Sequence, residues 1–102
     1  MESFVTGWTE PIRQQLLADG AAIDGTGVTL DLQLTDRWGG KVKTSGKVAW
    51  SNAATGIAQF TPAAEDLKAE GSPYGARWVV TVSSEVAYYP NSKDPDVWIV
   101  GR

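Results

Sequence analysis

Two segments of the chain alternate between apolar and polar side chains, residue by residue. The first runs from Gly27 to Thr35 and the second from Ala76 to Ser83. A period of two is typical of a β-strand with one buried face. Together with nearby apolar residues, this pattern predicts a core of Val28, Leu30, Leu32, Leu34, Trp50, Phe60, Leu67, Trp78 and Val80. Val79 makes the outer face of the second strand less polar than such a pattern usually gives.

Shorter apolar runs bounded by turn residues predict the remaining strands. The expected ranges are Ile12–Leu17, Lys47–Trp50, Gly56–Thr61, Glu85–Tyr89 and Asp96–Val100. The range Ile12–Leu17 also has good helix propensity. We interpret it as a strand because it is only six residues long and lies between Pro11 and Asp19-Gly20.

One segment, Pro62–Gly71, has helical features. Thr61 stands at the N-cap position, Pro62 suits the first helical position, and Gly71 is a typical C-terminal stop. The sequence therefore predicts one or two helical turns between strands.

About seven short strands at regular spacing indicate an all-β fold. We expect an immunoglobulin-like antiparallel β-sandwich with one short helical turn. A length of 102 residues fits a single domain, residues 1–102, with residues 1–9 as an N-terminal arm.

Charge and composition narrow the possible partners. The net charge is −3, and the nine basic residues are scattered along the chain. Nucleic acid and anionic membranes are bound by clustered Lys and Arg, so we expect neither as a partner. The chain has no Cys, which suits a protein made in a reducing cytoplasm.

The side chains available for catalysis are few. With no His and no Cys, the chain lacks the commonest general base and the soft metal ligands. Ser83-Ser84-Glu85 is interpreted as a turn, and the carboxylate pairs Glu65/Asp66 and Asp94/Asp96 as helix-start and turn residues. Asp94-Pro95-Asp96 is at most a weak calcium motif. We expect no catalytic residue, no metal site and no cofactor.

Four aromatic residues lie near predicted turns or chain ends and are candidates for protein binding. They are Trp8, Trp38, Tyr88 and Tyr89. Exposed aromatic side chains dominate many protein interfaces and also bind sugars. The alternative is that they only cover the ends of the sandwich.

The order of motifs resembles the immunoglobulin-like N-terminal domain of phage baseplate upper proteins and related phage tail proteins. The resemblance covers nearly all of residues 10–100. It rests on "PIRQQLLADGAAID", "VTLDLQLTDRWGG", "GKVAWSNAATGIAQFTPAAEDLKAEGSPYGARWVVTV" and "VAYYPNSKDPDVWIV". Baseplate members of the family continue into long trimerising segments, whereas this sequence ends at Arg102.

The resemblance implies a virion structural protein, made in the host bacterial cytoplasm, that docks onto other virion proteins without catalysis. The partners would be tail, baseplate, neck or capsid proteins, and the protein would be present in several copies or as a homo-oligomer. A carbohydrate-binding or host-surface adhesion module is the alternative function.

Overall fold

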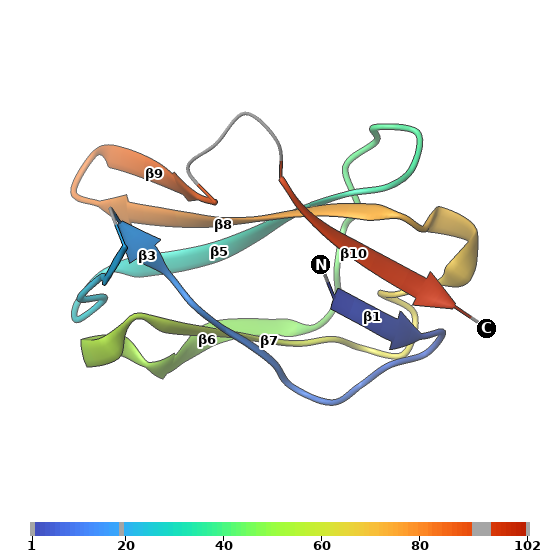
Figure 1. Ribbon diagram of the computed structural model, residues 1–102, viewed down its shortest axis with the longest axis horizontal. Coiled ribbons are helices and arrows are strands. Elements are labelled where there is room, and N and C mark those ends of the chain that lie inside the picture. The colour runs from blue at the N-terminus through green and yellow to red at the C-terminus, as the bar shows by residue number, and fades with distance from the viewer. Residues whose placement is uncertain (1, 19, 91–94, 102) are drawn as a thin grey trace.

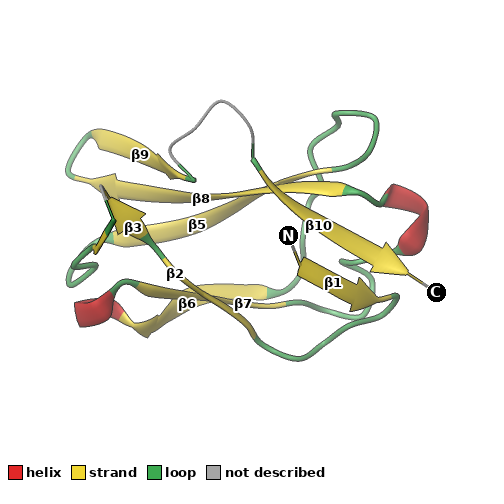
Figure 2. Cartoon of the chain, viewed as in Figure 1, coloured by secondary structure: helices red, strands yellow, loops and turns green. Residues whose placement is uncertain are grey.

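The computed structural model describes residues 2–18, 20–90 and 95–101 and shows an all-β sandwich (Figures 1 and 2). The larger sheet contains β1 (Glu2–Val5), β5 (Thr29–Thr35), β8 (Tyr74–Val82), β9 (Glu85–Tyr89) and β10 (Asp96–Gly101). The smaller sheet contains β2 (Ile12–Gln15), β6 (Lys47–Asn52) and β7 (Ile57–Thr61). A hairpin of β3 (Leu17–Ala18) and β4 (Ala21–Ala22) forms a separate two-stranded sheet.

The strand order is that of an immunoglobulin-like sandwich. The smaller sheet has the order β2-β7-β6, and the larger has the order β1-β10-β8-β5. The strands β2-β7-β6 correspond to strands B-E-D of the immunoglobulin fold, and β5-β8-β10 correspond to strands C-F-G. The first strand joins the larger sheet and runs parallel to β10. The predicted fold class is therefore confirmed.

Strands β9 and β10 share one edge of β8. Trp78 to Val82 of β8 pair with β9, whereas Tyr74 to Ala76 pair with β10. The opposite edge of β8 pairs along seven residues with β5. The sheet therefore divides into a β10 end and a β9 end along one side of β8 (Figure 1).

The core lies between the two sheets and is dominated by aromatic rings. Trp98 is fully buried. The centre of its ring lies 5.6 Å from the ring centre of Phe4 and 6.3 Å from that of Phe60. The indole N–H of Trp78 donates to Gln14 Oε1 at 3.0 Å, and this partly buried hydrogen bond joins the two sheets. A buried Trp needs such an acceptor because its N–H is otherwise costly to remove from water.

The predicted core is confirmed at its centre and less buried at one end. Leu34, Phe60, Leu67, Trp78 and Val80 are buried. The four other predicted members are only partly buried and pack against this cluster: Val28, Leu30, Leu32 and Trp50. Buried residues outside the predicted core include Phe4, Tyr74 and Trp98.

The short helical turn predicted in Pro62–Gly71 is present, but as a 3-10 turn, η2 (Ala69–Gly71), preceded by a turn at residues 64–66. The expected N-terminal arm is wrong in part, because Glu2–Val5 form β1 and Phe4 lies in the core. The second short 3-10 turn, η1 (Ala53–Thr55), links β6 to β7.

A buried carboxylate explains why no longer helix forms in Pro62–Gly71. Asp66 accepts hydrogen bonds from the backbone N–H groups of Ser45, Gly46 and Ala63, each at 2.8 Å. These contacts fix the Asp66 loop against the chain before β6 instead of allowing a helix to continue. Gly46 permits the approach, since a Cβ there would collide with the Thr61 carbonyl oxygen.

The start of β8 is held by a tyrosine corner, a feature of such sandwiches. The Tyr74 hydroxyl donates to the Lys68 carbonyl at 2.9 Å and accepts from the Lys68 N–H at 3.1 Å. Gly71 leaves room for this hydroxyl, because a Cβ at Gly71 would overlap it. The connection between the two sheets is therefore fixed by one side chain.

Candidate protein-docking surface

The outward face of the larger sheet carries apolar side chains in two groups. Near the chain ends, Val5, Val97 and Ile99 are exposed on β1 and β10. At the β9 end, Val86 and Tyr88 are 51% and 44% exposed. The registers Gly75↔Val97 and Val79↔Tyr88 place both groups on the same face of the sheet.

The local sequence explains why β10 is apolar on both faces. Trp98 and Val100 point inward and are buried, so the alternate residues Val97 and Ile99 must point outward. This uninterrupted run of apolar residues was the sequence signal for an exposed apolar face.

Of the four predicted anchors, Trp38 and Tyr88 are exposed. Trp38 is 73% exposed in the loop after β5. Asp36 shapes that loop, since its Oδ1 accepts from the N–H groups of Trp38 and Gly40. The Arg37 guanidinium lies 5.4 Å from the centre of the Trp38 ring, so one face of the indole is already occupied.

The other two predicted anchors are half-buried and pack against the core. The ring of Trp8 meets the ring of Phe4 edge-on at 5.4 Å, and its indole N–H donates to the Glu10 carbonyl. Tyr89 also packs against the core cluster. These two side chains cover the sandwich, as the alternative interpretation expected.

The four aromatics do not form one patch. The loop carrying Trp38 follows Thr35, which pairs with Gly75 at the beginning of β8. Tyr88 pairs with Val79, four residues further along the same strand. This separation corresponds to roughly 13 Å along the strand. Tyr88 belongs instead with Val79 and Val86.

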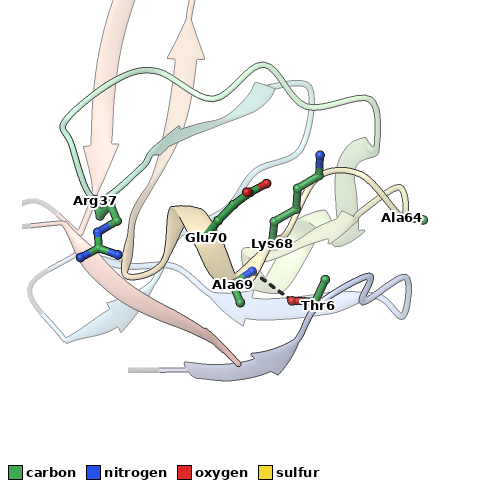
Figure 3. A pocket seen from close by; sticks show the side chains of 6 residues that line it. All are labelled: Thr6, Arg37, Ala64, Lys68, Ala69 and Glu70. Atoms are coloured by element: carbon green, nitrogen blue, oxygen red, sulfur yellow. Dashed lines mark hydrogen bonds between the residues drawn. The ribbon is translucent and has the colours of Figure 1, made fainter. Parts of the chain in front are cut away.

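A surface hollow of about 590 Å³ lies beside η2, near the end of β1 (Figure 3). Its lining includes Arg37, Lys68 and Glu70, so both signs of charge are present. The Ala69 N–H donates to Thr6 Oγ1 at 3.0 Å across its floor. The mixture of charges favours a polar rim around a docking surface over a site for one charged ligand.

Two of the candidate carboxylates, Asp66 and Asp96, accept hydrogen bonds that hold the fold. Asp66 is buried as described, and Asp96 Oδ2 accepts from the Trp98 indole N–H at 3.2 Å. Asp94 lies outside the described residues. Ser83 and Ser84 form the turn between β8 and β9. Within the described part of the chain, no three metal-ligating side chains gather.

Among the titratable groups of the described residues, the Asp24 carboxyl has a pKa that departs clearly from its ordinary value. The Thr26 side chain and then the Thr26 backbone N–H, which is 3.0 Å from Asp24 Oδ1, lower the pKa of the Asp24 carboxyl from its ordinary value. Asp24 is exposed in the turn before β5. The shift reflects a local turn, because hydrogen bonds to the charged form favour ionisation.

Neither the search for membrane-spanning helices nor the comparison with known proteins assigns the chain to a protein family. Among the described residues, no helix has the length and apolar character needed to span a membrane. The chain matches no protein-family model, no curated protein and no solved structure.

Proposed function

We propose that this chain is a virion structural protein of a bacteriophage, which docks onto tail, baseplate, neck or capsid proteins without catalysis. The observation that carries the docking role is the apolar outward face of the larger sheet. Val5, Val97 and Ile99 are exposed there on neighbouring strands. Contiguous exposed apolar side chains are typical of surfaces that bind other proteins.

The virion setting comes from the resemblance to phage baseplate domains. The immunoglobulin-like sandwich is the fold that this resemblance implies. Fold alone does not assign a function, so the docking role rests on the exposed apolar face of the larger sheet. Several copies per particle are expected, because a small domain gains stable attachment from repeated contacts.

The test is incorporation into particles. The chain is co-expressed with the tail and capsid proteins of its phage, and purified particles are analysed by quantitative mass spectrometry. We expect the parent protein in particles and a several-fold loss for Val97→Thr/Ile99→Thr. Threonine keeps the β-branched shape while removing apolar surface. The matched control is Ala49→Thr/Ser51→Thr, on exposed positions of β6.

Each result bears on a different part of the proposal. Absence of the parent protein from particles would exclude the virion role. Equal incorporation of the folded Val97→Thr/Ile99→Thr variant and its control would exclude this face as the docking surface. A Trp38→Ala/Tyr88→Ala variant tests the predicted anchors separately. Binding to a glycan array that Trp38→Ala abolishes would favour the carbohydrate-binding alternative.

A further inference from the structure

Strand β9 is exposed on both of its faces. Glu85, Val86, Ala87 and Tyr88 are all exposed, and only Tyr89 is partly buried. Within the described residues, β9 pairs with β8 alone. Its second edge therefore presents backbone N–H and C=O groups at a regular strand spacing.

A groove of about 560 Å³ lies between β9 and the β3 segment. One wall is β9, with Ala87 and Tyr88, and the other is the β3 segment, with Leu17 and Ala18. Figure 1 shows β3 beside the β9 end of the larger sheet. None of the described lining residues carries a charge.

This edge lacks most of the features by which proteins protect exposed strands. Natural edges are blocked by Lys, by inward-pointing charges, by bulges or by Pro. In β9 the only charged residue is Glu85 at the start, and Pro90 follows the last residue. The middle of the strand, Val86–Tyr88, is open and apolar. An extended backbone is the structure whose hydrogen-bonding groups match such an edge.

We propose that the groove between β9 and β3 receives an extended strand from a partner protein. The strand adds to β9 by main-chain hydrogen bonds and places uncharged apolar side chains against Leu17 and Ala87. This inference rests on the proposed docking function and names its mode at a second surface. Alternate side chains of the added strand also cover Val86 and Tyr88.

A second copy of this chain fits the groove less well than a foreign apolar strand. Antiparallel pairing of two β9 strands about Ala87 would set Glu85 of one copy opposite Tyr89 of the other. That arrangement would bring a carboxylate against the described lining residues, which carry no charge, and would therefore cost desolvation free energy. The cost of burying a charge therefore favours a partner strand without charged residues at the positions that face the groove.

The test uses a defined peptide and the intact chain. The probe is a blocked peptide of alternating threonine and valine with a lysine at each end. Its control replaces each valine with glutamate. Amide hydrogen exchange of β9 is measured by NMR with and without peptide. We expect the alternate β9 amides that do not pair with β8 to exchange more slowly, by roughly tenfold at about nine times Kd.

Two matched substitutions locate the binding. Ala87→Lys places a cation at the centre of the open edge, whereas Ala49→Lys makes the same change at an exposed position of β6. We expect the first to weaken peptide binding roughly tenfold or more and the second to leave it unchanged. Leu17→Lys, on the opposite wall, repeats the test if Ala87→Lys does not fold.

Three results would overturn the inference. They are an absence of β9 protection by the valine peptide, equal protection by the glutamate peptide, and a chain dimer that Ala87→Lys dissociates. The last would make a second copy the occupant. Particle incorporation is independent of the peptide assay. A chain that enters particles but binds no strand probe therefore loses only this inference, and a chain absent from particles loses the proposed function.

Discussion

Strands β8 and β9 are joined by a tight turn and pair with each other, yet the burial of their side chains differs sharply. Every second side chain of β8 from Tyr74 to Val80 is buried. In β9 four of five residues are exposed. The same backbone pairing therefore supports a strand that holds the sandwich together and a strand whose side chains contribute little to the core.

The difference comes from what lies beneath each strand. The inward side chains of β8 meet the smaller sheet, where Phe60 and Ala58 are fully buried. Below β9 lies an open hollow lined in part by Ile23, Asp24 and Val28. Stability is thus concentrated around β8, while the β9 end offers accessible backbone and apolar surface. Binding surfaces are commonly drawn from such weakly packed regions.

The largest expected effect is at Trp78. Trp78→Ala removes a buried ring and should lower the free energy of unfolding by roughly 3–5 kcal/mol. Tyr88→Ala on β9 should change it by about 0.5 kcal/mol or less, as for most surface positions. Urea denaturation measures both. Similar losses for the two variants would show that β9 is as tightly packed as β8.

A slightly smaller effect is expected at Asp66. Asp66→Ala leaves three backbone N–H groups without their acceptor, including those of Ser45 and Gly46. We expect a loss of about 3 kcal/mol, because hydrogen bonds to a charged group are strong and their loss leaves partly buried donors unpaired. Thermal melting provides the measurement. Glu65→Ala, at the exposed neighbouring position, is the control.

The tyrosine corner gives an intermediate effect. Tyr74→Phe removes both hydrogen bonds to Lys68 while keeping the buried ring. The expected loss is about 1–3 kcal/mol, the sum for two ordinary hydrogen bonds. Tyr88→Phe removes an exposed hydroxyl and should leave the melting temperature unchanged. If both variants melt together, the corner does not stabilise the start of β8.

The smallest effect concerns Asp24 at the β9 end. Its folded pKa is lowered by Thr26, so the ionised form contributes stability above the unfolded pKa. That contribution is lost as the pH falls through the folded pKa. Thr26→Val removes the side-chain donor and should raise the Asp24 pKa toward its ordinary value. Carboxyl NMR titration of parent and variant measures this, and an unchanged pKa would contradict the assignment.

Much of the fold follows from local pattern. The alternation in Gly27–Thr35 and Ala76–Ser83 predicts two strands, because a period of two can bury one face only in an extended chain. The structure forms them as Thr29–Thr35 and Tyr74–Val82. The turn residues between short apolar runs predict the sandwich. Trp38 and Tyr88 were also recognisable as exposed aromatics near turns. These inferences need only neighbouring residues.

Tertiary structure decided the rest, since it depends on residues distant in sequence. Propensity favoured a helical turn beginning at Pro62, but Asp66 instead binds the backbone of Ser45 and Gly46, about twenty residues earlier. Phe4 is buried because β1 pairs with β10 at the far end of the chain. Strand β9 pairs with β8 because β10 occupies only the first part of that edge of β8, and within the described residues no strand pairs with the outer edge of β9. Local pattern fixes which residues are extended, whereas strand neighbours and long-range hydrogen bonds determine which faces and edges remain open.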